Sequence, residues 1–232
     1  MARRVSLAVA AYVVLALAVV GWGWLLTHQL ADTVGGFDDD VSRWFADHRS
    51  ALLDPVANLG TLLGETWVGL AVSALVAIAS GVLDRSLRGP ALVLLADAGA
   101  GGIYWLASHA IPRDRPPVEI LDPGLVPTHS FPSGHVGTAV SVYGAAAILL
   151  ALHLSSAPMR RAAVATLLAL PVYVLLSRLY QGAHHLTDVA TSVVYATTWL
   201  VVLAWALRPA VLALEPVTRS DRGLRDTPVP HG

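Results

Sequence analysis

The chain has 232 residues, of which 55% are hydrophobic and 13% charged, with a formal net charge of -1 at pH 7. Such a low charged fraction excludes an ordinary soluble enzyme and indicates an integral membrane protein. Because the chain has no cysteine, it has no disulfide bonds, thiolate nucleophiles or thiolate metal sites, and its net charge gives no attraction to nucleic acid. Any catalysis must therefore rest on side chains such as His, Asp, Arg and Ser.

The first predicted element is a membrane span over about residues 5–27. This apolar run follows Arg3 and Arg4 and is long enough to cross a bilayer core, which needs ~20 helical residues. The alternative is a signal peptide, whose apolar core usually has only ~7 to 15 residues. No small-residue cleavage site follows convincingly, so we expect the run to remain as a span.

A polar and acidic segment follows, over about residues 28–65. Three aspartates at 38–40 stand where they could cap a helix that begins near Val41. Hydrophobic residues then recur at roughly helical spacing as far as Val56, which predicts one amphipathic helix in the membrane interface. Anchoring of this loop is the simpler role for the helix, and guiding a substrate is the alternative.

Five further apolar runs bring the predicted number of spans to six; they cover about residues 66–83, 91–111, 134–154, 162–176 and 189–207. The second of these runs contains Gly99, Gly101 and Gly102, small residues that let helices approach closely in lipid. It also contains Asp97, which we expect on the side of the membrane away from the polar loops, in a structural hydrogen bond rather than a functional role. The predicted fold is an all-α, six-span transmembrane bundle with an interfacial helix after the first span.

The placement of arginine predicts the orientation, because short cytoplasmic loops collect basic residues. A cytoplasmic N-terminus places most of the fifteen arginines inside. We therefore expect a multi-pass protein of the cytoplasmic membrane with both termini inside and the loops after the first, third and fifth spans outside. Residues 1–207 would form the membrane domain, and residues 208–232, rich in Pro, Arg and Asp, a disordered cytoplasmic tail.

The loop before the fourth span ends in a motif suited to binding an anion. Arg115 lies in this loop, and Pro132-Ser133-Gly134-His135 leads directly into the span. Backbone N–H groups at the helix start, with the hydroxyl of Ser133, can bind an anion, and Gly134 leaves room for its close approach. We expect His135 to lie in the same pocket, where it could donate a proton to a leaving oxygen.

A second polar stretch, S-R-L-Y-Q-G-A-H-H-L-T-D, occupies residues 177–188, between the fifth and sixth spans. If His184 and Asp188 lie on the helix that continues into the sixth span, their spacing puts both side chains on one face. Asp188 could then accept a hydrogen bond from one imidazole nitrogen and leave the other as a nucleophile. Taken singly, these residues could serve only as helix caps. Arg178 adds a planar cation that suits phosphate oxygens, which favours phosphoryl chemistry.

Three blocks of the sequence resemble the signatures of the type 2 phosphatidic acid phosphatase (PAP2) superfamily. They are Arg115-Pro116, then Pro132-Ser133-Gly134-His135, then Ser177-Arg178 followed by His184 and Asp188. The resemblance covers roughly residues 60–207 and extends to the six-span layout of the membrane branch of that family.

The resemblance implies a role for each matching residue. His184 would be the nucleophile that forms a phosphohistidine, Asp188 would orient it, and His135 would be the general acid. The phosphate-binding residues would be Arg115, Arg178, Ser133 and Gly134. The family's chemistry implies no metal and no other cofactor.

One position departs from the family pattern. The family has a lysine seven residues before the Arg of its Arg-Pro pair, and here that position is Ser108. In a continuous helix, residue 108 would share a face with Arg115 and lie about 10 Å from it along the axis. We therefore expect Arg113, just past Pro112, to bind phosphate and supply part of the missing positive charge.

The resemblance implies a membrane lipid phosphatase that acts at the outer face on a polyprenyl phosphate or diphosphate, phosphatidic acid or phosphatidylglycerol phosphate. The loops are too short for a separate recognition domain, so we expect the lipid to enter sideways between helices. No nucleic-acid partner is expected, and the oligomeric state stays open. The alternatives are a catalytically weakened protein that binds or transports lipid phosphates, motivated by Ser108, and a vanadate-dependent haloperoxidase, whose family members are soluble.

Overall fold

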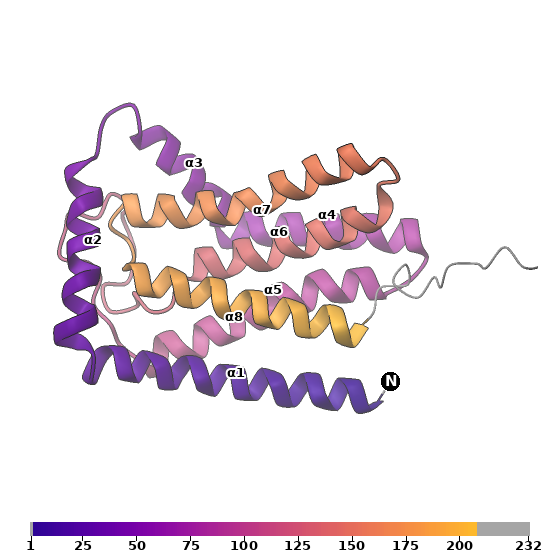
Figure 1. Cartoon of the computed structure of the whole chain (residues 1–232), viewed down its shortest axis with the longest axis horizontal. Coiled ribbons are helices and arrows are strands. Elements are labelled where there is room, and N and C mark those ends of the chain that lie inside the picture. The colour runs from indigo at the N-terminus through magenta and orange to yellow at the C-terminus, as the bar shows by residue number, and fades with distance from the viewer. Residues whose placement is uncertain (1, 208–232) are drawn as a thin grey trace, which may run out of the picture.

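The computed structural model describes residues 2–207, and their regular secondary structure is helical (Figure 1). The elements are α1 (Ala2–His28), a short π-helical turn η1 (Ala31–Gly35), α2 (Gly36–Asp47), α3 (Asp54–Gly64), α4 (Thr66–Asp84), α5 (Arg88–Ala110), α6 (Gly134–His153), α7 (Ala157–Tyr180) and α8 (Leu186–Leu207). Six of these helices, namely α1 and α4 to α8, are long and apolar enough to cross a membrane. The predicted all-α, six-span architecture is confirmed, while the predicted tail over 208–232 lies outside the described residues.

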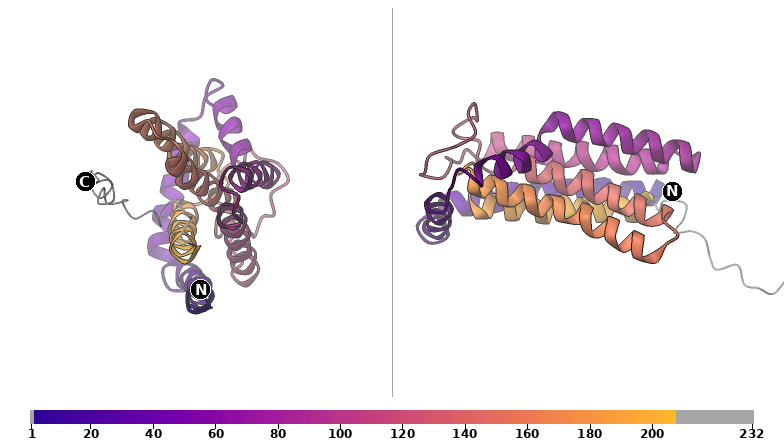
Figure 2. Two further views of the ribbon diagram at one scale, coloured as in Figure 1. Left: turned by 90° about the vertical axis from the view of Figure 1, so that its right-hand side faces the viewer. Right: turned by 90° about the horizontal axis from the view of Figure 1, so that it is seen from above.

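The six long helices lie side by side, and successive spans run in opposite directions (Figures 1 and 2). One end of the bundle carries the segment after α1, the α5–α6 connection and the turn between α7 and α8, and α2 lies across this end (Figure 1). The first residues of α1 and the last residues of α8 lie at the other end. All the polar stretches singled out in the sequence therefore gather at one end of the bundle.

The segment after α1 differs from its prediction of one helix beginning near Val41. It contains two helices, and α2 begins earlier, at Gly36. The helical pattern is interrupted after residue 47 because Pro55 occupies the first turn of a new helix, where its missing N–H and fixed φ are tolerated. Asp38 lies inside the first turn of α2 with no exposed surface, so it does not act as the predicted cap. The place of α2 in the membrane interface stays a prediction.

Helix α6 is the most deeply buried span, and small residues allow its neighbours to pack closely around the core. An added side chain at Gly99 would meet the ring of Trp199, and one at Gly102 would meet the hydroxyl of Tyr12. These two glycines therefore have the close-packing role predicted for them. Gly101 has nothing within 4 Å of an added Cβ atom and instead lines a cavity.

Candidate active site

A glycine in a left-handed conformation ends α7 and turns the chain toward the two histidines. Gly182 has φ +69°, and a side chain there would come within 2.8 Å of both Arg49 and the backbone oxygen of Glu119. Glycine is the residue that accepts both this conformation and this close approach. The chain then reaches His184 before α8 begins at Leu186.

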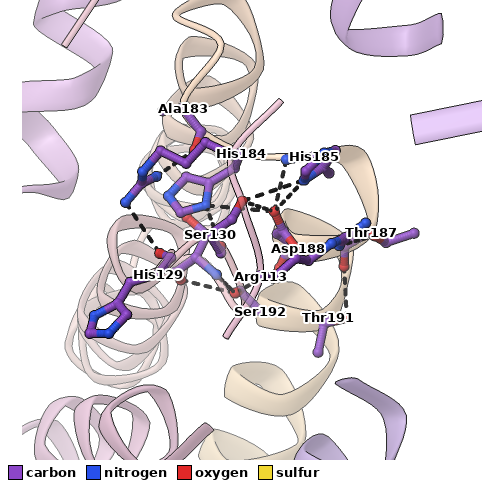
Figure 3. Close-up of polar contacts among 12 residues, drawn as sticks. Arg113, His129, Ser130, Ala183, His184, His185, Thr187, Asp188, Thr191 and Ser192 are labelled. Carbon is purple, nitrogen blue, oxygen red and sulfur yellow. Dashed lines mark hydrogen bonds and ion pairs between the residues drawn. The ribbon is translucent and has the colours of Figure 1, made fainter. Parts of the chain in front are cut away.

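His184 is buried, and a backbone carbonyl orients it (Figure 3). Its Nδ1 lies 2.7 Å from the carbonyl oxygen of Ser130, whereas the nearest oxygen of Asp188 is 3.8 Å from Nδ1. The predicted direct bond to Asp188 is therefore replaced, because His184 precedes α8 and does not share its first turn. A carbonyl oxygen can only accept, so Nδ1 carries the proton and Nε2 keeps its lone pair.

Asp188 is fully buried and acts on His184 through Ser130 (Figure 3). Its Oδ2 accepts bonds from the Ser130 hydroxyl at 2.6 Å and from the backbone N–H of His185 at 2.8 Å. Its Oδ1 accepts a bond from Arg113 at 2.5 Å. Asp188 thereby holds both the residue whose carbonyl orients His184 and the turn that carries His184.

The surroundings of His184 favour its neutral form. Burial lowers the pKa of His184 to about 4, against the opposing effect of Asp188 and with support from the charges of Arg178 and Arg115. A neutral imidazole with a free Nε2 is the form that can attack an electrophile. The geometry and the charge state at neutral pH therefore both suit a nucleophile.

Arg113 occupies a different place from the one predicted for it. Its Nη1 donates to Asp188 and to Thr187 Oγ1, the latter at 2.8 Å, and its Nη2 donates to Asp38 at 2.8 Å. Burial alone would lower the pKa of Arg113, but the two carboxylates raise it above its ordinary value. Because both Nη atoms are bound to carboxylates, this geometry favours a structural role for Arg113, and its phosphate-binding role stays a prediction.

The reason for this difference is that α5 ends at Ala110, before Pro112. Beyond that point the chain folds back on itself, so that the N–H of Ser130 donates to the Arg113 carbonyl at 3.0 Å. Residue 108 and Arg115 are therefore not on one continuous helix. Ser108 is buried and donates its hydroxyl to a backbone carbonyl of its own helix, so it offers no cation to the site.

Asp38 is the residue near Asp188 that the sequence analysis missed. Its Oδ2 accepts the bond from Arg113, while the backbone N–H of Thr187 donates to Oδ1 at 3.1 Å and the hydroxyl of Thr187 donates to Oδ2. A carboxylate at the first turn of α8 is also favoured by the helix dipole. No local pattern distinguishes Asp38 from its acidic neighbours, and its partner Thr187 lies 149 residues away in the sequence.

Two of the predicted phosphate-binding side chains have buried polar atoms without partners. Arg178 is fully buried, and its Nη1 donates to Asp122 at 2.9 Å, to Gln181 at 2.8 Å and to Thr61 at 3.0 Å. Its Nε and Nη2, and the hydroxyl oxygen of Ser133, have no hydrogen-bond partner within residues 2–207. Buried donors of this kind are costly unless a ligand binds them, and a guanidinium fork matches the oxygens of a phosphate.

Arg115 is bound by backbone carbonyls and not by carboxylates. It donates to the carbonyl oxygens of Val126 at 3.0 Å, Ala183 at 2.5 Å and His129 at 3.2 Å. Burial lowers the pKa of Arg115, and the nearby charge of Arg178 lowers it further. An anion beside these two cations would relieve their repulsion, so their arrangement favours a negatively charged ligand.

Comparison with known proteins now assigns the family. The model of the PAP2 superfamily matches residues 89–211, which is more than half of the chain. The chain belongs to the PAP2 superfamily. No curated protein matches the sequence. Among solved structures, the chain is similar to a transmembrane PAP2-type phosphatidylglycerolphosphate phosphatase from Bacillus subtilis, with 23% identity and a TM-score of 0.68 over 94% of this chain and 100% of that chain. At this identity the likeness concerns the fold.

The PAP2 family resemblance drawn from the sequence is thus confirmed, and the chain is a multi-pass membrane protein of a phosphatase superfamily. The roles of the individual residues stay predictions.

The start of α6 leaves several backbone N–H groups without a bond inside the helix, which is the feature of a helix N-terminus that can bind an anion. The N–H of Ser133 donates to the hydroxyl of Ser192 at 2.9 Å. The first hydrogen bond of the helix runs from the N–H of Gly137 to the carbonyl of Ser133, so the N–H groups of residues 134–136 lie before the first bonded N–H.

A cavity of about 580 Å³ extends from these PAP2 signature residues into the bundle. Its polar end is lined by Arg115, Gly134, His135 and His184. Much of the rest is apolar or aromatic and includes Leu70, Leu94, Ala98, Tyr104 and Trp105. Asp97 also lines this cavity, in addition to accepting the expected structural hydrogen bond, which comes from Ser73 at 3.1 Å. Asp97 thus lines the cavity from a position well before the end of α5, and no hydrogen bond or ion pair within residues 2–207 joins it to the histidines.

Proposed function

We propose that this PAP2 protein is a membrane lipid phosphatase that works through a phosphohistidine on His184. The observation that carries the proposal is the pairing of a neutral, carbonyl-oriented His184 with the unpartnered buried donors of Arg178 and Ser133. In the first step Nε2 of His184 attacks phosphorus, the bond from phosphorus to the lipid oxygen breaks, and His135 gives that oxygen a proton. Water then attacks the phosphohistidine, His135 takes the water's proton, and inorganic phosphate leaves.

Positive groups would stabilise the charge that develops on the phosphate oxygens in both steps. Arg115 and Arg178 would carry most of this role, with Ser133 and the amides at the start of α6 beside Gly134. These groups need no metal ion to bind a phosphate, and within residues 2–207 no three His, Asp or Glu side chains gather to hold one. We therefore propose a metal-independent reaction.

The cavity supports a lipid substrate because much of its wall is apolar while its polar end carries the histidines. We propose that the lipid phosphate enters sideways from the bilayer, with its tail along α4 and α5. Candidate substrates are polyprenyl phosphates and diphosphates, phosphatidic acid and phosphatidylglycerol phosphate, the last also suggested by the printed name of the Bacillus subtilis protein. Turnover confined to water-soluble esters would contradict lateral entry.

We further propose that residues 1–207 act as one phosphatase unit in the cytoplasmic membrane, with the site outside and the N-terminus inside. The support is the sequence pattern, in which most of the fifteen arginines lie in the segments expected inside. Because the chain lacks cysteine, single cysteines can test the orientation. Those near Gly124 and Gln181 should react with a membrane-impermeant reagent on intact cells, whereas one near Ser86 should not. The reverse labelling pattern would place the site in the cytoplasm.

The enzyme proposal is tested by purifying the whole chain in detergent and measuring phosphate release from the four lipid classes. Release should continue in EDTA and should be inhibited by orthovanadate, which mimics the trigonal-bipyramidal transition state of phosphoryl transfer. Activity that a chelator removes and magnesium restores would point to another mechanism.

Ser108 favours a second candidate function, a catalytically weakened protein that binds or transports lipid phosphates. The cation that the family places at this position is absent, and Arg113 is committed to carboxylates and does not replace it. The same purified protein separates the two functions. Saturable binding of a lipid phosphate without phosphate release from any lipid would establish the second function and exclude the first.

A further inference from the structure

The junction between α3 and α4 packs directly against the predicted general acid. An added side chain at Gly64 would lie 3.0 Å from Cβ of His135, so only a residue without a side chain fits here unless a neighbour moves. One residue earlier, the carbonyl of Leu63 accepts a hydrogen bond from Tyr143 at 2.8 Å, which fixes the junction to α6. The next residue, Glu65, is therefore held beside the imidazole by its neighbours on both sides.

Glu65 contacts His135 from a separate side of the site. Its Oε1 lies 3.3 Å from Nε2 of His135, and its side chain is 35% exposed. Glu65 lines a second cavity of about 350 Å³ together with Asn58, Asp122 and Gln181. His135 lines the larger cavity, and the two cavities share no lining residue. The pair of side chains therefore joins a small polar opening to the proposed lipid cavity.

The charges around His135 give Glu65 a specific task. His135 lines the same cavity as His184 and Arg115, and Arg115 is a permanent cation. Positive neighbours disfavour a protonated imidazole, yet a general acid must begin the reaction protonated. Glu65 places a carboxylate within hydrogen-bond reach of His135, so it can offset the nearby positive charge.

We propose that Glu65 is a positioning residue that holds a proton on Nε2 of His135 and leaves Nδ1 to do the chemistry. The inference rests on the proposed function, in which His135 is the acid. In the first step Nδ1–H gives its proton to the lipid oxygen as the bond to phosphorus breaks. The neutral imidazole keeps Nε2–H bound to Glu65, so the lone pair on Nδ1 is ready to take a proton from the attacking water. One nitrogen thus serves both steps.

The test uses the leaving group of the substrate as its readout. An alkyl leaving group such as that of dodecyl phosphate needs a proton, whereas the nitrophenolate of 4-nitrophenyl phosphate leaves without one. We expect Glu65→Gln to lower kcat/KM, which reports only the step in which the leaving group departs, about 10-fold or more on the alkyl ester and less than about 2-fold on the nitrophenyl ester. Glu65→Asp keeps the charge and should recover part of the loss. Glu119→Gln, an exposed acid in the same group of loops, is the matched control and should behave like the parent.

His135→Ala and the double variant separate failure of this inference from failure of the proposed function. His135→Ala should show the same dependence on the leaving group, and adding Glu65→Gln should cost nothing further, because the two residues act as a unit. If His135→Ala loses the two activities equally, the acid assignment itself is wrong. If His135→Ala loses more activity on the alkyl ester than on the nitrophenyl ester but Glu65→Gln does not, the role of Glu65 is overturned while the proposed function stands.

Discussion

Two polar clusters meet at His184, and they treat their charges in opposite ways. The closed cluster consists of Asp38, Arg113, Ser130 and Asp188. The second cluster, which we call the cation cluster, consists of Ser133, Arg115 and Arg178, which are predicted to bind phosphate. In the closed cluster one guanidinium lies between two carboxylates, and each of their oxygens accepts a bond. In the cation cluster, among residues 2–207, Arg115 is bound by carbonyls and Arg178 keeps two nitrogens without a partner.

The same types of side chain can either hold a structure in place or remain available to bind a ligand. Satisfied ion pairs fix the geometry of a buried turn, whereas unsatisfied donors raise the free energy of the empty site until an anion binds. Ser130, whose carbonyl orients His184, belongs to the closed cluster, so the rigidity of that cluster would be transmitted to His184. Variants that disturb one cluster should therefore be distinguishable from variants that disturb the other.

The largest effect on activity is expected from removing the side chain of His184, which lies between the two clusters. His184→Ala should lower kcat by at least about 10³-fold, as loss of a nucleophile does in other enzymes, while the protein stays folded. His185→Ala is the matched control, because its backbone N–H still donates to Asp188. Phosphate release by the two purified variants checks the prediction, and an equal loss would mean that the nucleophile is misassigned.

Breaking the closed cluster should act first on stability. Arg113→Ala leaves Asp38 and Asp188 buried without their cation, so the free energy of unfolding should fall by about 3–5 kcal/mol. The additional substitution Ser108→Lys should not restore the stability of Arg113→Ala, because the missing charge belongs to the closed cluster. Chemical denaturation in detergent measures the loss.

A matched pair on α2 sharpens this prediction. Asp38→Asn should weaken the same cluster, whereas Asp40→Asn removes only a surface ion pair with Arg43, a type of contact worth about 0–1 kcal/mol. An Arg113→Ala protein with parental stability but a raised KM would return Arg113 to the phosphate-binding set.

Removing a buried donor that has no partner should lower activity without lowering stability. Ser133→Ala deletes a buried hydroxyl without a partner, so Tm should stay constant or rise, while kcat/KM falls about 10- to 100-fold if the hydroxyl binds the phosphate. Ser141→Ala deletes another buried, unpartnered hydroxyl on the same helix and should leave activity unchanged. Paired melting curves and kinetics test this, and a destabilised Ser133→Ala protein with parental kinetics would contradict it.

The last prediction concerns the pH dependence of stability. The pKa of His184 is about 4 in the folded protein and ~6.5 in an unfolded chain. Between these values the unfolded state binds the additional proton, so stability should fall as pH drops from about 6.5 to about 4 and change no further from this group below that. His184→Asn should lack this part of the pH dependence. Melting temperatures of both proteins at pH 7 and pH 5 provide the measurement.

The features that sequence predicted well are those encoded locally. The spans follow from the length of the apolar runs, and the approach of α5 to its neighbours follows from Gly99 and Gly102. The signature residues cluster because every second loop lies at the same end of the bundle. Each of these inferences needs only the chemistry of a short stretch and the alternation of spans across a bilayer.

The features that sequence missed depend on contacts between distant segments. The Ser130 carbonyl that orients His184 comes from a residue 54 positions earlier, and Glu65 is 70 positions from His135. No pattern within one helix reports such pairs. Arg113 was misplaced for a local reason, since the expected continuous helix ends before Pro112 and the returning loop turns the side chain toward Asp38.

The bond from α2 to α8 has a consequence for how the protein is made. Asp38 and its partner Thr187 are 149 residues apart, so at ~5–20 residues per second the ribosome needs roughly 7 to 30 seconds to synthesise the second after the first. During that interval the carboxylate of Asp38 has no partner from α8, because α8 has not yet been made. The closed cluster therefore forms only after the sixth span has been inserted into the membrane, which makes completion of the catalytic end a late event in biogenesis.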